Sequence, residues 1–383
     1  MSQPRNIMIL AGEASGDLHG ARLVDAVRTR RDDVSFCGMG SAKLRAVGVD
    51  LLVDSSRIAV VGLVEVLRHW PEIKRALKTI EDAITRTPPD LLILIDYVEF
   101  NLRIAAVAKR LGVRVLFYVS PQIWAWRPER IHKIGALVDK MAVIFPFEVE
   151  LYEKANVPVA YVGHPLVGHV TSTATRESLG SELRIPAQNK LIGLLPGSRG
   201  NEIQNILPVL LDAACDLNED RSDLSFVLPL APGVSRMDVE RQLRKRNLQN
   251  VHLLDKRAYD VMASADCIAI ASGTATLEAA LMEAPMVIVY RVSALSWLWM
   301  KRKLTISRVG LANIVAQRPV VPELIQSDCR RDRVADELRK LLEDNQYAER
   351  MRIDLAETKA LLGTKDTAVE VAKLVDELLK LTH

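Results

Sequence analysis

A carboxylate stands directly after an uninterrupted aliphatic run in the first half of the chain. The run is Leu91–Ile95, and the residue after it is Asp96. Such a run is typical of a strand buried on both faces of a parallel sheet. A carboxylate at its end often has a raised pKa and can accept a proton from an alcohol, so we predict Asp96 as a general base, with Glu99 as the other candidate. The structural alternative is that Asp96 caps the helix that starts near Asn101.

A second acidic turn follows the first aliphatic run of the chain, residues 7–10. It contains Glu13, Ser15 and Asp17 and leads into an amphipathic stretch over residues 21–30. Its glycines are spaced four apart, which is neither the Gly-x-Gly-x-x-Gly pattern of dinucleotide folds nor a Walker loop. The three polar residues nevertheless lie where open α/β sheets bind their ligands, beyond the carboxyl end of a strand.

The middle of the chain has the composition of an anion-binding turn. Aliphatic residues 191–195 are followed by Pro196 and Gly197, then by Ser198 and Arg199, and a helical pattern begins near Asn201. The first turn of a helix offers unpaired N–H groups and a partial positive charge, so with Ser198 and Arg199 the turn suits a phosphate. The alternative is an ordinary strand-to-helix loop with a solvated arginine.

A similar strand, turn and helix start recurs at residues 271–278. Gly273 permits close approach of the backbone, Ser272 or Thr274 can cap the helix and contact phosphate, and Glu278 lies about one turn into the helix. A carboxylate at that place can accept hydrogen bonds from both hydroxyls of a ribose. In the alternative interpretation the turn is only a helix cap and Glu278 is a surface residue.

Tryptophans and cations gather in three stretches. The loop after residues 113–119 contains Trp124, Trp126, Arg127 and Arg130, which suit the wall of a sugar or acyl site and a phosphate contact, or alternatively cover the edge of the core.

The other two stretches, residues 63–77 and 295–303, are amphipathic and basic. They contain Trp70, and Trp297 with Trp299, beside lysines and arginines. This composition is typical of a segment at a lipid headgroup boundary, and core packing with a solvated basic face would give the same pattern.

The order of the predicted elements explains how these residues are positioned. Short apolar runs alternate with helical patterns twice, on either side of a polar segment at residues 171–178. This alternation predicts an α/β protein with two doubly wound parallel sheets. We place an N-terminal domain at 1–168, a C-terminal domain at 169–345, and helices that pack back across the domain boundary at 346–383.

Composition excludes several classes of protein. The chain has 383 residues, enough for about two domains, and Lys plus Arg exceed Asp plus Glu only by 51 to 48, so the sequence does not suggest a nucleic-acid partner. The 4 cysteines form no Cys-x-x-Cys pair, which favours a reduced cytosolic setting, and no apolar run is long enough to span a bilayer. We find no metal motif and predict neither a metal nor a cofactor.

Together these motifs resemble bacterial lipid-A-disaccharide synthase, and they occur in the family's order from about residue 7 to residue 326. The stretches that carry the resemblance are Ala11-Gly-Glu-Ala-Ser-Gly-Asp17, Val61-Gly-Leu-Val-Glu-Val66, Val119-Ser-Pro-Gln-Ile-Trp-Ala-Trp-Arg127, Leu195-Pro-Gly-Ser-Arg-Gly-Asn-Glu202, Ala271-Ser-Gly-Thr-Ala-Thr-Leu-Glu278 and Asn313-Ile-Val-Ala-Gln-Arg-Pro-Val-Val-Pro-Glu323. The sequence departs from the family at Tyr97-Val98, where an Asp-x-Pro turn is common, and at Ala312 and Gln317.

The resemblance implies a GT-B fold, in which two Rossmann-like domains face each other across a cleft, the N-terminal domain binding the acceptor and the C-terminal domain the UDP-sugar. It implies an inverting transfer of 2,3-diacylglucosamine from UDP to the 6-hydroxyl of 2,3-diacylglucosamine 1-phosphate, which gives the β-1,6 lipid A disaccharide and UDP. By this resemblance Asp96 is the general base and Glu13 an essential acidic residue, while Arg199, Glu278 and Asn313 belong to the UDP side.

The implied substrates carry acyl chains, so we expect work at the cytoplasmic face of the inner membrane, with a homodimer as one admissible assembly. Two rival functions remain open. One is another GT-B enzyme acting on a UDP-amino sugar, such as a 2-epimerase or a polyprenyl-linked transferase. The other is a peripheral membrane protein that binds a nucleotide without catalysis.

Overall fold

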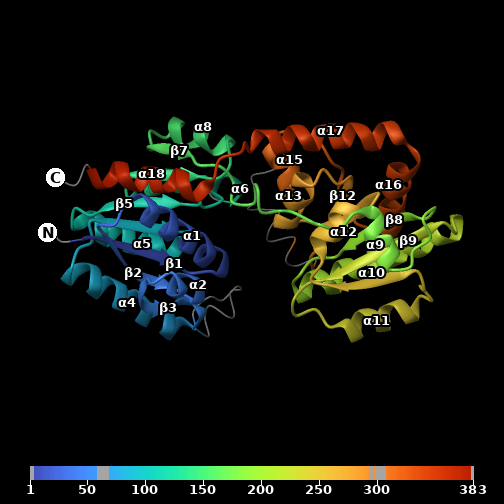
Figure 1. The fold of residues 1–383 in the computed structure, drawn as a ribbon, viewed down its shortest axis with the longest axis horizontal. Helices are drawn as coiled ribbons and strands as arrows, with labels where there is room; N and C mark the ends of the chain where they lie inside the picture. The colour runs from blue at the N-terminus through green and yellow to red at the C-terminus, as the bar shows by residue number, and fades with distance from the viewer. Residues whose placement is uncertain (1–3, 58–68, 127, 294–296, 298–307, 381–383) are drawn as a thin grey trace. The chain divides into compact units, whose positions relative to one another are not determined.

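The structure, a computed structural model, describes residues 4–57, 69–126, 128–293, 297 and 308–380. The chain divides into two compact units. Unit 1 comprises Met1–Val167 together with Gly363–His383, and unit 2 comprises Gly168–Leu362. Unit 1 is therefore assembled from both ends of the sequence (Figure 1).

Unit 1 is built on a parallel sheet of 7 strands in the order β3-β2-β1-β4-β5-β6-β7. The strands are β1 (Arg5–Ala11), β2 (Val34–Gly40), β3 (Asp50–Asp54), β4 (Leu91–Ile95), β5 (Arg114–Tyr118), β6 (Lys140–Val143) and β7 (Val159–Tyr161). The helices are α1 (Ala14–Arg30), α2 (Ala42–Ala46), the 3-10 turn η1 (Ser55–Arg57), α4 (Trp70–Arg86), α5 (Val98–Arg110), α6 (Ile123–Trp126), α7 (Arg130–Gly135), α8 (Phe147–Lys154) and α18 (Thr367–Lys380).

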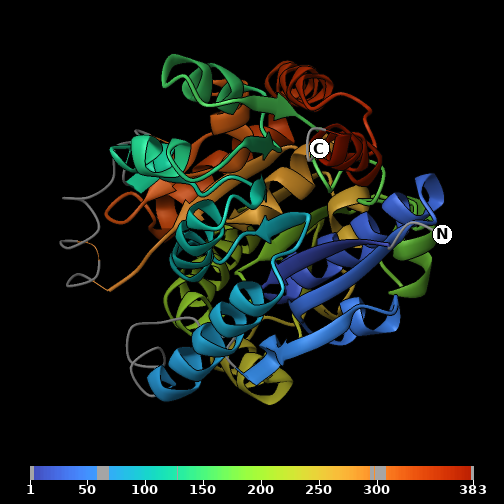
Figure 2. The same cartoon turned by 90° about the vertical axis from the view of Figure 1, so that its left-hand side faces the viewer.

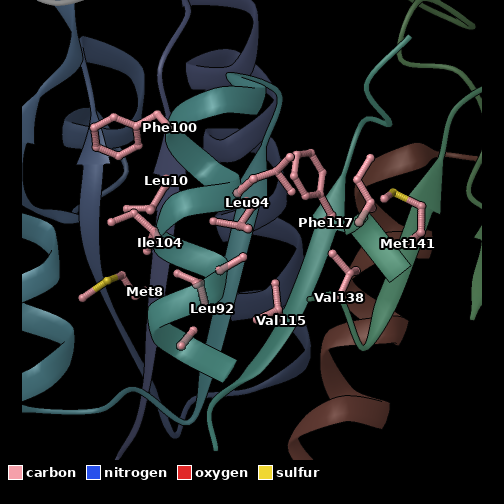
Figure 3. Close-up of a cluster of buried hydrophobic side chains, with 14 of the residues drawn as sticks. Met8, Leu10, Leu92, Leu94, Phe100, Ile104, Val115, Phe117, Val138 and Met141 are labelled. Atoms are coloured by element: carbon pink, nitrogen blue, oxygen red, sulfur yellow. The ribbon is translucent and has the colours of Figure 1, made fainter. Parts of the chain in front are cut away.

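The central strand β4 is buried on both faces, as its aliphatic run predicts. Leu92 and Leu94 point into a cluster that includes Ile104 of α5 (Figure 3). On the opposite face, the Cδ1 atom of Ile95 lies 3.3 Å from the position where a Cβ of Gly20 in α1 would stand. Each such aliphatic side chain contributes about 1.5–3 kcal/mol when it is removed from water, which fixes β4 in the middle of the unit.

The C-terminal helix α18 packs against α1, the first helix of the chain. Its apolar face includes Val371 and Val375, which are fully buried. Asp376 adds ion pairs to Arg30 (2.7 Å) and Arg31 (3.8 Å). In Figure 2, as in Figure 1, helices cover both faces of the unit 1 sheet. The last helix thus completes the helical layer over the N-terminal sheet.

Unit 2 repeats the architecture with a parallel sheet of 6 strands in the order β10-β9-β8-β11-β12-β13. The strands are β8 (Lys190–Leu195), β9 (Leu224–Leu230), β10 (Val251–Asp255), β11 (Cys267–Ala271), β12 (Met286–Tyr290) and β13 (Glu323–Ile325). The helices are α9 (Arg176–Glu182), α10 (Gly200–Asp220), α11 (Arg236–Lys245), α12 (Ala258–Ser264), α13 (Thr274–Leu281), α15 (Leu311–Ala316), α16 (Arg331–Glu343) and α17 (Asn345–Leu361).

The helices after β13 are shared between the units. α16 packs against α10, and α17 packs against α13 and α15, all within unit 2. Of the segment 346–383, α17 therefore belongs to unit 2 and α18 to unit 1. Among the residues that the structure describes, every helix is too short or too polar to span a bilayer.

Both sheets have the strand order of a Rossmann fold, and this order determines where ligands bind. Successive strands are added toward one edge of the sheet and then toward the other, and this change of direction falls between β1 and β4 in unit 1 and between β8 and β11 in unit 2. Open α/β sheets bind ligands beyond the carboxyl ends of the strands at such a reversal. The loops after β1 and β4, and those after β8 and β11, are therefore the places to look for function.

Candidate active site

The loops after β1 and β4 lie next to each other at the carboxyl edge of the unit 1 sheet. The two strands pair so that Ala11 lies beside Ile95. The residues that follow, Gly12 and Asp96, therefore leave the sheet side by side. The packing is close, because a Cβ atom on Gly12 would lie only 2.2 Å from Cγ of Tyr97. Only glycine fits under the tyrosine ring.

Glu13 belongs to the same corner of unit 1. Burial raises the pKa of Tyr97, and the negative charge of Glu13 raises it further, which is evidence that the carboxylate lies near the phenol. The fold thus brings the loop of Glu13 against the loop of Asp96. These are the two residues that the sequence analysis predicts as catalytic.

Asp96 has the environment expected for a general base. Its side chain is half-buried, and burial raises its pKa, although a hydrogen bond from the backbone N–H of Tyr97 opposes that effect. The backbone is strained here, since Asp96 (φ 48°) and Tyr97 (φ 43°) both adopt left-handed conformations that side chains disfavour. A partly desolvated carboxylate is a stronger proton acceptor than one in water.

The structure also bears on the two alternatives for this turn. Helix α5 begins at Val98, earlier than the predicted start near Asn101, and its capping residue is Tyr97, without a side-chain cap. Asp96 is therefore not the N-cap of α5. The side chain of Glu99 is 71% exposed and forms an ion pair with Arg130 at 2.5 Å. The solvated Glu99 is the weaker candidate for the base.

Asp17, grouped with Glu13 in the sequence analysis, has a structural role. It is buried and accepts hydrogen bonds from the backbone N–H (2.6 Å) and hydroxyl (2.7 Å) of Ser41, and from the N–H groups of Lys43 (2.9 Å) and Leu44 (3.3 Å). These bonds hold the start of α2 and lower the pKa of Asp17 against the opposing effect of burial. Both carboxylate oxygens of Asp17 already accept hydrogen bonds within the protein, so a role in ligand binding is not supported.

In unit 2, the turn after β8 carries the residues predicted to bind phosphate. Gly197 has a φ of 105°, and a Cβ there would lie 2.3 Å from Oε2 of Glu202. That oxygen accepts hydrogen bonds from the N–H groups of Ser198 (2.9 Å) and Arg199 (3.2 Å). The Arg199 side chain is 74% exposed and lies 3.5 Å from Glu202. Glu202 therefore caps the amides at the start of α10, while the guanidinium extends into solvent.

The turn after β11 lies beside the turn after β8, because β8 and β11 are paired strands. Ser272 donates its hydroxyl proton to the carbonyl of Val309 at 2.9 Å, so its remaining capacity is as an acceptor. Gly273 has a φ of 152°, and nothing lies within 4 Å of its Cβ position. Gly273 and Thr274 are both exposed at the start of α13. Backbone N–H groups at an open helix start suit an anionic oxygen.

Glu278 lies further along α13 and is half-buried. It accepts a hydrogen bond from the hydroxyl of Tyr259 at 3.0 Å. Burial raises the pKa of Glu278, and the bond from Tyr259 partly offsets this. The alternative of an ordinary surface glutamate does not fit these contacts.

Asn313 differs from its predicted role as a direct contact. Its side chain is only 1% exposed. The amide nitrogen donates to the carbonyl of Val321 (2.9 Å) and to Glu323 (2.7 Å), and the amide oxygen accepts from the N–H groups of Val320 (2.7 Å) and Val321 (3.0 Å). All four hydrogen-bonding positions of the amide are used within the protein. The side chain of Asn313 therefore holds the loop before β13 and has no hydrogen-bonding group left for a nucleotide.

The two tryptophans of α6 have different surroundings. Trp124 is half-buried, packs edge-on against Phe145 and Phe147, and donates its indole N–H to Glu148 at 3.1 Å. Trp126 is 37% exposed. Two roles are expected for these tryptophans from the sequence, the wall of a ligand site and a cover for the edge of the core. The packing of Trp124 fits a cover for the core edge, and the exposed part of its ring remains available to a ligand.

The remaining aromatic and basic candidates are spread over both units. Trp70 begins α4, is 41% exposed, and has the guanidinium carbon of Arg103 at 5.9 Å from its ring centre. Trp297 belongs to unit 2 and is partly exposed. Arg127 and Trp299 lie outside the described residues.

Four residues that hold the site, Tyr259, Glu148, Glu202 and Asn101, were not predicted from the sequence to contribute to it. Tyr259 and Glu148 hold Glu278 and Trp124 from elements distant in sequence, so no local pattern marks them. Glu202 was visible, because a glutamate three residues after the N-cap is a capping signal. Asn101 belongs to no recognisable sequence motif. It lies about one helical turn after Asp96 and Tyr97, so its side-chain amide can reach the backbone of that turn. Within the described ranges, no group of three or more His, Cys, Asp or Glu side chains is arranged to hold a metal ion.

Comparison with known proteins identifies the family. A family profile described as lipid-A-disaccharide synthetase matches residues 7–374. The chain is 49% identical over 373 residues to the lipid-A-disaccharide synthase of Geobacter sulfurreducens, with 97% of each chain covered. It is 46% identical over 358 residues to that of Nitrosococcus oceani, covering 93% of this chain and 92% of the relative. The chain belongs to the lipid-A-disaccharide synthase family. It is accordingly a glycosyltransferase of lipid A biosynthesis, as the resemblance predicts.

Solved structures support the fold independently of sequence. A putative UDP-N-acetylglucosamine 2-epimerase from Listeria monocytogenes aligns with a TM-score of 0.63 at 12% identity, covering 98% of this chain and 96% of that one. The kitacinnamycin glycotransferase aligns with a TM-score of 0.62 at 14% identity, covering 98% and 99%. The predicted GT-B class is confirmed, while identities this low establish only the fold. The family match does not favour either rival function, the epimerase or the non-enzymatic protein.

Proposed function

We propose that this protein transfers 2,3-diacylglucosamine from its UDP carrier to the 6-hydroxyl of 2,3-diacylglucosamine 1-phosphate. The products are the β-1,6-linked disaccharide 1-phosphate and UDP. The observation that carries the proposal is the partly desolvated carboxylate of Asp96 beyond the carboxyl end of β4, where the strand order of unit 1 changes direction, in a chain of this family.

Asp96 takes the proton of the acceptor hydroxyl as the new bond forms. The oxygen attacks the anomeric carbon of the donor sugar, the bond from that carbon to the UDP oxygen breaks, and the configuration inverts. UDP leaves with the electron pair, so the proton on Asp96 balances the reaction. A general base of this kind contributes about 10² to 10⁴ in rate. Glu13 lies on the adjoining loop and helps to set the charge around the hydroxyl.

Unit 2 binds UDP in this proposal. The exposed guanidinium of Arg199 meets the pyrophosphate, and the open helix start at Gly273 supplies backbone N–H groups. The Glu278 carboxylate, half-buried beside Tyr259, accepts hydrogen bonds from the ribose hydroxyls. Stabilising the departing diphosphate in this way needs no metal ion.

Four further residues of unit 2 support binding of the nucleotide. Ser272 and Thr274 flank Gly273 and offer hydroxyl oxygens to the phosphate, and Gly197, with a φ of 105°, permits the tight turn before Arg199. Asn313 acts indirectly by holding the loop before β13.

Acylated sugars reside in a membrane, so the enzyme works as a peripheral protein on the cytoplasmic face of the inner membrane. Trp70, exposed at the start of α4, lies on the same helix as exposed Lys74 and Arg75 and close to Arg103. An exposed indole with cations around it suits the headgroup region of anionic lipids. Trp124 and Trp126, with Trp297, are the proposed contacts to acyl chains, and Arg127 and Trp299 join them from outside the described ranges.

The test is turnover with defined substrates. The protein is incubated with UDP-2,3-diacylglucosamine and 2,3-diacylglucosamine 1-phosphate in detergent, and UDP and disaccharide are quantified by mass spectrometry. We expect the two products in equal amounts, and no UDP release when the acceptor is omitted. Turnover of unacylated UDP-N-acetylglucosamine alone would contradict the proposal.

A further inference from the structure

The side chain of Asn101 is fully buried next to the strained turn that carries Asp96. Its exposed fraction is 0%, although asparagine is a residue that proteins mostly leave in water. Asn101 lies in the first part of α5, four residues after Tyr97. A buried amide at this place calls for a physical reason.

Asn101 donates hydrogen bonds to three successive backbone carbonyls. Its side-chain nitrogen donates to the carbonyls of Ile95 (3.2 Å) and Asp96 (2.6 Å), and its backbone N–H donates to that of Tyr97 (3.1 Å). These carbonyls span the passage from the end of β4 to the start of α5. One residue therefore holds the whole turn.

The arrangement leaves one polar atom without a partner. Among the described residues, nothing donates a hydrogen bond to the buried Oδ1 of Asn101. The orientation of the amide is nevertheless determined, because only its NH₂ end can donate to two carbonyls. A buried acceptor without a partner is unfavourable, so the position is not explained by stability alone.

The side-chain amide of Asn101 holds the backbone of Asp96 in its observed conformation. Asp96 and Tyr97 adopt consecutive left-handed conformations, which persist only where the surroundings enforce them. Other restraints on this turn are the ring of Tyr97 over Gly12, the hydrogen bond from the Tyr97 N–H to the Asp96 carboxylate, and a long hydrogen bond of 3.4 Å from the Asp96 N–H to the carbonyl of Tyr118. None of these contacts restrains the carbonyls of Ile95 and Asp96.

We propose that Asn101 is a positioning residue for Asp96, which fixes the direction of the base by anchoring the carbonyls on both sides of its Cα. This inference rests on the proposed function of Asp96. Without the side-chain bonds, the turn relaxes toward ordinary backbone angles and the carboxylate moves away from the acceptor hydroxyl. A misplacement of about 1 Å can cost on the order of 10²-fold in rate.

The experiment compares Asn101→Ala with a matched control in the full-length protein. Asp90 stands at the other end of β4, where its carboxylate accepts hydrogen bonds from the N–H of Asn6 and the guanidinium of Arg5, both at 2.8 Å. Asp90→Ala therefore removes a comparable anchor of the same strand, far from the turn. We expect Asn101→Ala to lower kcat by about 10- to 100-fold with acceptor KM and UDP affinity within about twofold of wild type, and Asp90→Ala to leave kcat nearly unchanged.

The double variant Asn101→Ala/Asp96→Asn shows whether Asn101 acts through the base. If it does, adding Asn101→Ala to Asp96→Asn costs less than about threefold, because the group being positioned is already gone. An equal loss in both backgrounds, or an equal loss in Asp90→Ala, would make Asn101 merely structural and overturn the proposal. So would wild-type kcat in Asn101→Ala.

Two controls separate this inference from the proposed function. If wild-type protein fails to form disaccharide, or if Asp96→Asn is fully active, the proposed function itself fails. If those two results are as expected and only the Asn101 variants depart from the expected kcat, the positioning role of Asn101 alone is overturned. Should Asn101→Ala not fold, as judged by circular dichroism and UDP binding, Asn101→Ser replaces it. Its hydroxyl is too short to bridge the carbonyls of Ile95 and Asp96, so the same loss of kcat is expected, and wild-type kcat there would overturn the proposal.

Discussion

Glu148 should make the stability of the protein fall as the pH rises. The carboxyl group is almost fully buried, and its acceptor bonds come from the indole N–H of Trp124 (3.1 Å) and the backbone N–H of Phe145 (3.2 Å). Burial raises its pKa from 4.5 to about 7, against the smaller opposing effect of these bonds. The perturbation is Glu148→Gln, which keeps the shape of the side chain and removes its titration.

The sign and size of the effect follow from the two pKa values. Below pH 4.5 the group is protonated in both the folded and the unfolded chain, so the folded state carries no penalty from it. Between 4.5 and about 7 the unfolded chain loses its proton first, and stability declines until the folded group ionises as well. Each tenfold change in an acid constant corresponds to about 1.4 kcal/mol, so the free energy of unfolding should fall by about 2–3 kcal/mol between pH 5 and pH 8.

The assay is urea unfolding of the full-length protein at pH 5, 6, 7 and 8, followed by tryptophan fluorescence. Gln loses one acceptor bond, but that loss is the same at every pH. The free energy of unfolding of Glu148→Gln relative to wild type should therefore rise by about 2–3 kcal/mol over this range. Glu150→Gln is the control, because Glu150 lies on the same helix but is 72% exposed. A constant difference between Glu148→Gln and wild type at all four pH values would refute the reasoning.

Three further changes test separate parts of the site. Arg199→Ala should weaken UDP binding measured by calorimetry by about 1.5–3 kcal/mol, the range for a charged hydrogen bond, whereas Arg244→Ala, a similarly exposed arginine, should not; normal UDP affinity in Arg199→Ala would contradict the placement. Gly12→Ala should cost about 1–3 kcal/mol in unfolding and lower kcat, because the new methyl meets the Tyr97 ring; unchanged stability and rate would refute that contact. Trp70→Ala should reduce flotation with anionic vesicles, and equal flotation would remove this residue from the membrane contact.

The two sheets and the order of their strands and helices were predictable because the patterns that indicate them, aliphatic runs and amphipathic stretches, are local in the sequence. The aliphatic run Leu91–Ile95 is buried along its whole length and forms the central strand β4, as expected. The loops of Glu13 and Asp96 meet because parallel strands end at the same edge of a sheet, and this follows from alternation alone. The path of the last helix was not predictable, since the apolar stripe of α18 does not specify which unit it covers.

The detailed roles of polar residues depend on contacts between distant segments. Asn313 matches a family motif, yet its amide is used up by the backbone of residues 320–321 and by Glu323, which no sequence pattern displays. Asp17 and Glu13 have the same kind of sequence environment, but only Asp17 meets the N–H groups at the start of α2. Tertiary hydrogen bonding, rather than residue type, therefore distinguishes the structural carboxylate of Asp17 from the carboxylate of Glu13, which is proposed to be functional.

The most direct test of the central claim is the rate of disaccharide formation by Asp96→Asn, with Glu99→Gln as the matched control on the same turn. If Asp96 is the base, Asp96→Asn should lose about 10² to 10⁴ in kcat while binding UDP normally, and Glu99→Gln should retain nearly full activity. An Asp96→Asn variant that forms disaccharide at the wild-type rate would contradict the account.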